Sequence, residues 1–154
     1  MRIVAGRLKG RAIVAPEGQG TRPTSDRARQ AVFNILEHSS WAEALDGARG
    51  AIRENADAYG VMGATRVHRR SAVDLGVRPG SDGEAFDIAF LDPPYAKGLG
   101  EQCLARLIEG NWLKPGALVV FERGSDEPDI DTPGYDRLDA RDYGAARVLF
   151  LKVA

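Results

Sequence analysis

Cysteine, histidine and long apolar runs are scarce in this chain of 154 residues. The one cysteine, Cys103, cannot form an internal disulfide and has no cysteine partner for a zinc site, and His38 and His68 match no ligand spacing. We therefore expect no metal. No stretch reaches the roughly 18–20 consecutive apolar residues of a membrane span, and residues 1–6 are too short for the apolar part of a secretory signal. These absences favour a soluble cytoplasmic protein with no membrane partner.

A further absence concerns the glycine-rich turn and the following acidic residue by which α/β proteins bind nucleoside-bearing cofactors. Residues 41–50 lead up to the point where the strand before such a turn is expected. The next residues, 51–55, already resemble the middle of a helix that comes later in such a fold. The pattern indicates that roughly 30 residues, about one βαβ unit, are missing between Gly50 and Ala51.

Three explanations for this gap compete: the printed sequence omits unordered residues, the chain was cut, or the natural chain lacks the segment. We favour the first. Removing two strands and a helix from the middle of a parallel sheet would expose apolar faces and unpaired backbone groups.

What the chain does contain is ordinary globular material, with 44% hydrophobic and 28% charged residues. This length and composition suit a single domain, residues 1–154, which we expect to be monomeric. The net charge of −1 hides an asymmetry, because residues 1–30 hold seven arginines and lysines against two acidic residues, a local +5 that leaves −6 elsewhere. Such a cluster is typical of phosphate contact, although charge alone is equally compatible with a solvated surface.

Short apolar runs and turn residues divide the chain into strands and helices. A hairpin with a basic tip is expected from residues 2–5 and 11–15, in an N-terminal extension of residues 1–20. The other expected strands cover residues 65–69, 86–91, 117–121, 135–143 and 147–153. The expected helices cover residues 24–36, capped by Thr24 or Ser25, residues 52–59, ending at Gly60, and residues 101–109. Strand, helix and strand from residue 86 to 121 predict a right-handed parallel crossover, and the last two strands predict an antiparallel pair at the sheet edge.

The most informative motif is the apolar strand of residues 86–91, which ends on Asp92-Pro93-Pro94-Tyr95. Proline has no amide donor and forces the preceding residue out of the helical region, so the strand must end in a stiff, extended turn. That turn presents a carboxylate, carbonyl oxygens and an aromatic ring together. The combination suits a flat nucleobase whose exocyclic amine needs acceptors and whose face needs a stacking partner, and it indicates amino-group methylation.

The same four residues could also be an inert turn that only terminates the strand. Their expected position favours a site, because ligands of open α/β sheets bind outside the carboxyl ends of the strands. Glu122, at the end of a buried strand, is interpreted as structural and left out of the site. Cys103 is interpreted as packing, and His38 and His68 as core or surface residues.

Two blocks of sequence carry a resemblance to a known family. The first is Arg2-Ile3-Val4-Ala5-Gly6 with Gly10-Arg11, followed by residues 21–36, which begin Thr21-Arg22-Pro23-Thr24-Ser25-Asp26-Arg27; the second is Leu91-Asp92-Pro93-Pro94-Tyr95. With these blocks the chain resembles the bacterial RsmD-type methyltransferases of guanine N2 in 16S ribosomal RNA. The Arg-Pro-Thr block is the more specific, because many amino methyltransferases share Asp-Pro-Pro-Tyr.

The resemblance implies an α/β fold: a Rossmann-like, S-adenosylmethionine-dependent methyltransferase sheet with helices on both faces, an antiparallel C-terminal edge hairpin and the N-terminal hairpin extension. It implies S-adenosylmethionine as methyl donor, no metal, and 16S ribosomal RNA or a partly assembled small subunit as partner. The residues expected to be catalytic are Asp92, Pro93, Pro94 and Tyr95. Those expected near the cofactor are Thr24, Ser71, Ala72 and Asp92. Those expected to contact RNA are Arg7, Lys9, Arg11, Arg22, Arg27 and Arg29.

In the expected mechanism, Asp92 and the carbonyl of Pro93 accept the two N–H bonds of the guanine amine and aim its lone pair at the methyl group, while Tyr95 stacks on the base. No strong base is needed, because the amine loses its proton once it becomes cationic. Two alternatives remain open: methylation of adenine N6 in DNA or RNA, and a nucleic-acid-binding scaffold without catalysis.

Overall fold

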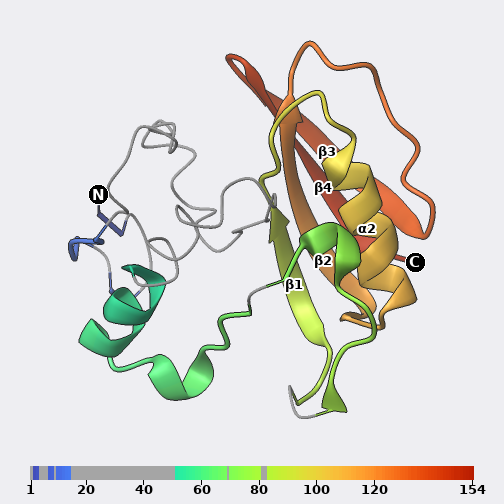
Figure 1. Ribbon diagram of the computed structural model, residues 1–154. Coiled ribbons are helices and arrows are strands. Elements are labelled where there is room, and N and C mark those ends of the chain that lie inside the picture. The colour runs from blue at the N-terminus through green and yellow to red at the C-terminus, as the bar shows by residue number, and fades with distance from the viewer. Residues whose placement is uncertain (1, 4–6, 9, 15–50, 69, 81–82) are drawn as a thin grey trace. The chain divides into compact units, whose positions relative to one another are not determined.

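The computed structural model describes residues 2–3, 7–8, 10–14, 51–68, 70–80 and 83–154 (Figure 1). The chain forms two compact units, residues 1–69 and residues 70–154, and each is described by itself. The expectation of a single domain stays a prediction. The helix expected at residues 24–36 lies outside the described residues.

The N-terminal hairpin is visible in the first unit as an antiparallel bridge between Arg2 and Ala12. Around it, the amide of Ile3 donates to the carbonyl of Arg11 at 3.0 Å, and the amide of Gly10 donates to the carbonyl of Ile3 at 2.8 Å. Gly10 has a φ of +87°, a conformation that glycine adopts readily, which lets the chain reverse there. These contacts bear out the hairpin for its described residues.

A helix covers residues 51–58 and is followed by Gly60 at a φ of +65°, which agrees with the expected helix end. The 3₁₀ turn η3, Met62–Ala64, follows. The strand expected at 65–69 is wrong for its described part, because residues 65–68 belong to no strand. Both donors of Thr65 are used locally instead: its amide bonds to Met62 and its hydroxyl to the carbonyl of Val61 at 2.8 Å.

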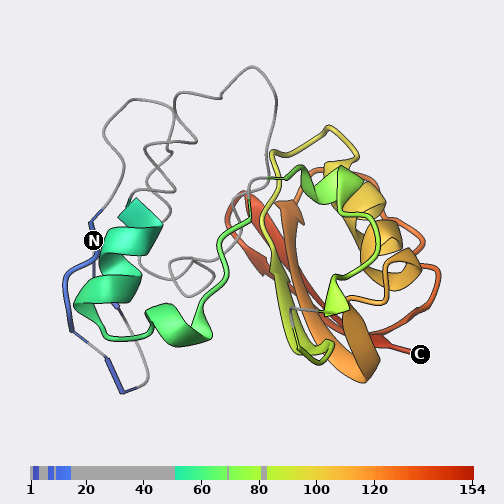
Figure 2. The ribbon, with the colours of Figure 1, turned by 60° about the horizontal axis from the view of Figure 1, so that its bottom comes forward.

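The second unit is built on a four-stranded sheet in the order β1-β2-β4-β3 (Figures 1 and 2). The strands are β1 (Phe86–Leu91), β2 (Leu113–Gly124), β3 (Tyr135–Tyr143) and β4 (Ala146–Val153). β1 and β2 are parallel, and the helix α2 (Leu99–Glu109) connects them, while the other pairs are antiparallel. The parallel crossover unit and the C-terminal antiparallel pair are therefore confirmed.

The core lies between α2 and one face of this sheet (Figure 2). Because strand side chains alternate between faces, Ala117, Val119 and Phe121 of β2 point to the same side, and all three are buried. The helix can approach closely because Gly100 has no side chain: a Cβ there would overlap the ring of Phe121. The other apolar residues of β2 lie on the opposite face and are only half-buried.

β2 is longer than the strand expected at residues 117–121, because pairing begins at Leu113 and passes through Pro115. Residues 113–116 are thus part of the strand, as an irregular stretch where the register between β1 and β2 shifts. At the amino end of β1, the rings of Phe86 and Trp112 stack at a centroid distance of 6.4 Å. No helix among the described residues combines the length and apolar character needed to cross a membrane.

Candidate active site

The carboxyl ends of the parallel strands β1 and β2 place two acidic residues at one edge of the sheet. Leu91 is paired with Phe121, so Asp92, the first residue after β1, lies beside Glu122, which still belongs to β2 and is paired with Val148 of β4. By strand alternation both lie on the face opposite Phe121 and α2. This edge is where ligands of open α/β sheets bind.

Tyr95 connects the turn to β2. Its hydroxyl donates to Oε1 of Glu122 at 2.6 Å, a short bond of the kind that hydroxyls make with carboxylates. Glu122 is only 7% exposed, so this bond satisfies a charge that would otherwise be costly to bury. The sequence interpretation of Glu122 as merely structural overlooked this contact, and the pairing of the two parallel strands was the signal that could have revealed it.

Asp92 is half-buried beside Glu122. Burial, and then repulsion from the Glu122 carboxylate, raise the pKa of Asp92 from 3.8 to about 6. At neutral pH the side chain is still mostly an anion and an acceptor, but it becomes a donor a short way below neutrality. Such a shift at a strand end is typical of a functional site.

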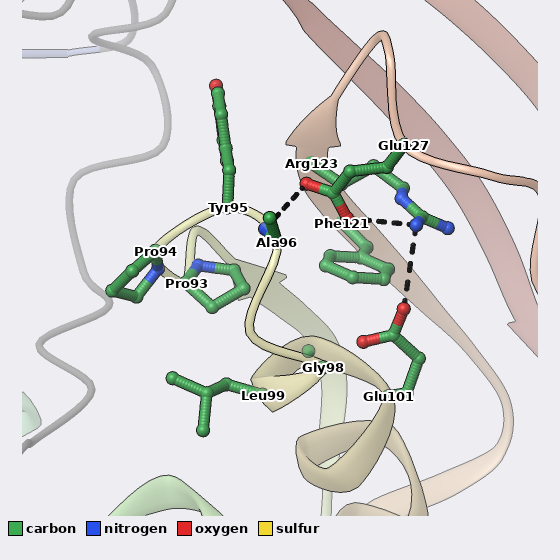
Figure 3. Close-up of a pocket in the computed structure, with 11 residues that line it drawn as sticks. Pro93, Pro94, Tyr95, Ala96, Gly98, Leu99, Glu101, Phe121, Arg123 and Glu127 are labelled. Atoms are coloured by element: carbon green, nitrogen blue, oxygen red, sulfur yellow. Dashed lines mark hydrogen bonds and ion pairs between the residues drawn. The ribbon is translucent and has the colours of Figure 1, made fainter.

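The turn Asp92–Tyr95, which we call the proline corner, has one proline ring that points inward and one that points outward (Figure 3). Pro93 is buried and Pro94 is exposed, while Tyr95 rises from the turn away from α2. Behind the corner lies a cavity of about 10 Å³, bounded among others by Gly100 and Phe121, which is room for about one water molecule. This cavity is too small to hold a ring-shaped ligand, and the exposed side of the corner is the side open to one.

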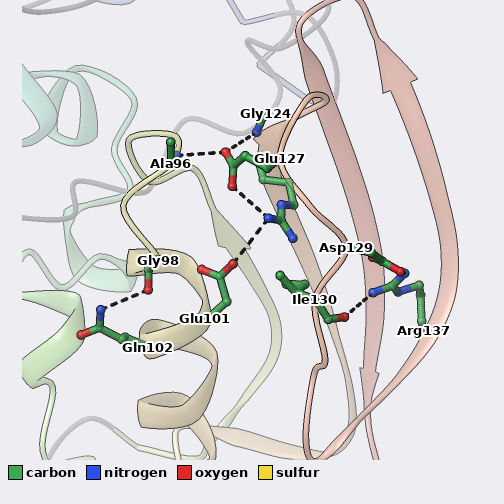
Figure 4. Close-up of polar contacts among 10 residues, drawn as sticks. Ala96, Gly98, Glu101, Gln102, Gly124, Glu127, Asp129, Ile130 and Arg137 are labelled. Carbon is green, nitrogen blue, oxygen red and sulfur yellow. Dashed lines mark hydrogen bonds and ion pairs between the residues drawn. The ribbon is translucent and has the colours of Figure 1, made fainter.

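A second polar group supports the corner from the α2 side (Figure 4). Glu127 accepts hydrogen bonds from the amides of Ala96, at 3.0 Å, and Gly124, at 2.8 Å. Its other oxygen pairs with the buried Arg123 at 2.9 Å, and Arg123 also faces Glu101 of α2 at 3.6 Å. The sequence analysis missed this group as well.

Ser71 and Ala72, two of the residues expected near the cofactor, lie elsewhere in the same unit. Ser71 precedes the 3₁₀ turn η4 (Ala72–Asp74), and Ala72 is buried. η4 packs against α2, where the guanidinium of Arg106 donates to the carbonyl of Val73 at 3.3 Å. No contact described for residues 70–154 joins Ser71 or Ala72 to Asp92 or Tyr95, so their cofactor role stays a prediction.

The residues expected to contact RNA belong to the first unit. Arg7 is exposed in the hairpin turn, and the guanidinium of Arg11 lies over the ring of Tyr59, 5.6 Å from its centroid. Arg11 therefore has an internal partner, although a guanidinium stacked on a ring can still face a phosphate. The remaining members of the set, Lys9, Arg22, Arg27 and Arg29, lie outside the described residues, as does Thr24, which was expected near the cofactor.

Cys103 agrees with its interpretation as a packing residue, because it is 2% exposed and burial raises the pKa of its thiol to about 12. Within the described ranges, no three histidine, cysteine or acidic side chains are grouped to hold a metal ion.

A β1-α2-β2 crossover with acceptors and an aromatic ring at its carboxyl edge, together with the structural neighbours, identifies a Rossmann-like methyltransferase fold. Solved structures share the fold: one described as a methyltransferase of Escherichia coli matches 99% of this chain and 97% of its own length with a TM-score of 0.75 at 22% identity. Another, described as a methylase of Haemophilus influenzae, covers 75% of this chain and 80% of its own length with a TM-score of 0.60 at 26% identity.

The family model described as Conserved hypothetical protein 95 matches residues 1–51 and 37–152. The ribosomal RNA small subunit methyltransferase D of Escherichia coli is 30% identical over 146 residues, which span 79% of this chain and 74% of that protein. The protein of the same name from Haemophilus influenzae is 28% identical over 173 residues, 94% of this chain and 89% of that protein. The chain belongs to this family, the RsmD-type methyltransferases.

These matches also bear on the region near residue 50. The family model matches in two stretches that meet and overlap at residues 37–51. The alignment with the Haemophilus influenzae protein runs over 173 positions, which is 19 more than the 154 residues of this chain. At least 19 residues of that protein are therefore aligned with a gap in this chain.

Proposed function

We propose that this protein methylates the exocyclic N2 of a guanine in 16S ribosomal RNA, with S-adenosylmethionine as methyl donor. The observation that carries the proposal is the juxtaposition of Asp92, Glu122 and the Tyr95 hydroxyl at the carboxyl edge of two parallel strands. Family membership and relatives named as ribosomal RNA methyltransferases support the substrate class. The acceptor is the RNA itself or a partly assembled small subunit, and we keep the cytoplasm as the proposed location.

The proposed chemistry depends on orientation. The lone pair of the guanine amine is delocalised into the ring, so it attacks only when the nitrogen is pyramidal and aimed. Asp92 and the Pro93 carbonyl accept the two N–H bonds and turn the lone pair toward the methyl group, and the ring of Tyr95 holds the base plane. The Glu122 bond limits rotation of the Tyr95 phenol.

The acidic edge also fits the donor. S-adenosylmethionine supplies a methyl group on a positively charged sulfonium, and a cation beside Asp92 and Glu122 would relieve the repulsion between these two carboxylates. Asp92, Ser71 and Ala72, the described residues among those expected near the cofactor, would hold it.

We further propose that the segment between Gly50 and Ala51 is missing from the printed sequence. The two-part family match and the alignment longer than the chain support this. The edge of β1 gives independent support, because Phe86 and Ile88 are each 46% exposed although strands of parallel sheets are normally covered.

Methyl transfer decides the proposal. The purified protein is weighed by intact mass spectrometry and incubated with tritiated S-adenosylmethionine and small-subunit RNA, and the labelled nucleoside is identified after digestion. We expect N2-methylguanine and a mass above 16.6 kDa. Labelled N6-methyladenine would replace the proposal by the adenine alternative, and a 16.6 kDa chain that binds RNA but no cofactor would favour the scaffold.

A further inference from the structure

Ala96, the residue after Tyr95, has a backbone conformation that its side chain disfavours. Its φ is +58°, and Asn111 is the one other non-glycine residue with positive φ in the described part of the chain. A left-handed alanine brings its Cβ close to the next carbonyl, so this conformation persists only where the surroundings hold it. Whatever holds Ala96 also determines the direction in which Tyr95 leaves the turn.

The carboxylate of Glu127 is the group that holds it (Figure 3). Oε1 accepts the Ala96 amide at 3.0 Å and the Gly124 amide at 2.8 Å, and Oε2 accepts from Arg123 at 2.9 Å. One side chain thus connects the turn after β1 with the last residue of β2. Burial opposes ionisation of Glu127, but these hydrogen bonds outweigh burial and lower the pKa of its carboxyl group. The clamp, by which we mean the Glu127 carboxylate with its bonds to Ala96, Gly124 and Arg123, therefore stays charged at neutral pH.

Arg123 makes the clamp rigid. Its side chain is 5% exposed, and Glu127 and Glu101 are its ion-pair partners in the described part of the chain. Glu101 lies in the first turn of α2, so the clamp also reaches the helix that follows the corner. Nε of Arg123 is buried and makes no hydrogen bond to a described residue, which leaves the compensation of its charge to the two carboxylates.

Gly124 gives the carboxylate the space it needs. A Cβ on Gly124 would lie 2.8 Å from Oε1 of Glu127, closer than real Cβ contacts occur. Because Oε1 is the end of a flexible side chain, an alanine at this position would push the carboxylate away from the two amides without changing any charge.

We propose that Glu127 is a positioning residue of the methyl-transfer site: by clamping the Ala96 amide to the end of β2, it fixes the Tyr95 ring and the Asp92 acceptor in line with the bound base. This inference rests on the proposed function. The described partners of Glu127 are the amides of Ala96 and Gly124 and the guanidinium of Arg123, so its proposed effect passes through the turn.

The test compares Glu127→Gln and Gly124→Ala with wild type, and uses Asp129→Asn as the control. Asp129 lies in the same loop and loses the same charge, but it pairs with Arg137 on the surface. We expect both clamp variants to lower kcat for methyl transfer about tenfold to a hundredfold, the size of effect that small misalignments produce, with KM for RNA nearly unchanged. Ala96→Gly, which removes the backbone strain, should restore part of the kcat of Glu127→Gln.

Amide hydrogen exchange provides a readout that needs no activity. The Ala96 amide should exchange faster in Glu127→Gln than in wild type, and at the wild-type rate in Asp129→Asn. Unchanged exchange at Ala96 overturns the clamp, and faster exchange with unchanged kcat overturns the positioning role. A wild-type protein that methylates no RNA refutes the proposed function instead, and the exchange rates still decide whether the clamp exists.

Discussion

At the scale of single residues, Asp92 is the acceptor on which the proposed chemistry depends most. Asp92→Ala removes one of the two groups that orient the amine and leaves every basic residue in place. We expect turnover to fall by about 10²-fold or more, by analogy with the loss of other preorganised polar groups, while RNA binding is retained. Single-turnover methyl transfer and a filter-binding titration measure the two quantities, and wild-type turnover in this variant would contradict the assignment.

The raised pKa of Asp92 predicts the pH dependence of the reaction. The acceptor has to be ionised, so activity is full above the pKa and is lost as the pH falls through about 6, roughly tenfold per pH unit further down. Glu122→Gln keeps an oxygen for the Tyr95 hydroxyl but removes the repulsion, which lowers the pKa of Asp92 and moves the acid limb to lower pH.

The matched control for this shift is Tyr95→Phe. It removes the hydrogen bond between the Tyr95 hydroxyl and Glu122 but keeps both carboxylates, so its acid limb should not move to lower pH. The rate constants are measured from pH 5 to pH 8, and an acid limb that is unchanged in Glu122→Gln would rule out the coupling between the two carboxylates.

At the scale of elements, the approach of α2 to the sheet depends on Gly100. Its Cβ position overlaps the Phe121 ring, and Phe121 is 1% exposed and cannot swing outward. Gly100→Ala should therefore destabilise the fold by about 1–3 kcal/mol, despite the better helix propensity of alanine, which lowers Tm by roughly 2–12 °C.

Thermal unfolding followed by circular dichroism measures this effect. Gly80→Ala is the control in the same unit, because nothing lies within 4 Å of a Cβ at that position. Equal Tm values for Gly100→Ala and Gly80→Ala would show that α2 is not packed as described.

At the scale of the whole molecule, the region near residue 50 decides whether the donor can bind. If the purified protein weighs no more than 16.6 kDa, the protein itself lacks the segment. Inserting the corresponding segment of the Haemophilus influenzae relative between Gly50 and Ala51 should then create S-adenosylmethionine binding. Ligand at 100 times its Kd would then stabilise the chimaera by about 2.7 kcal/mol, which appears as a rise in Tm.

A glycine-serine insertion of equal length is the control, since it restores the spacing without the strands. Binding of S-adenosylmethionine by the unmodified 154-residue chain with the same affinity would refute the missing segment.

The basic hairpin belongs to the same scale, because its proposed role is long-range attraction to phosphate. Reversing the charge of Arg7 and Lys9 should weaken RNA binding and reduce the slope of log K against log salt by about one for each lost phosphate contact. Binding isotherms at several salt concentrations test this. An unchanged slope would mean that the hairpin does not contact phosphates.

Local patterns were enough to identify the strand Phe86–Leu91, the helix on residues 101–109 and the corner Asp92–Tyr95, because proline chemistry and side-chain periodicity act over a few residues. The pairing of β1 with β2 and of β3 with β4 followed from the same patterns together with the short connections between them. The strand expected at 65–69 failed, since Thr65 bonds back to the preceding turn and no partner strand competes for it in the described residues.

The roles of Glu122 and Glu127 emerged only from the folded chain. Each is one carboxylate among 22 acidic residues, and nothing adjacent in sequence distinguishes it. Their partners Tyr95 and Ala96 lie 27 and 31 residues away and meet them only when two parallel strands align in register. The local sequence therefore determines the corner. Only the tertiary structure determines which two acidic side chains hold the corner in place, because register and burial are properties of the assembled sheet.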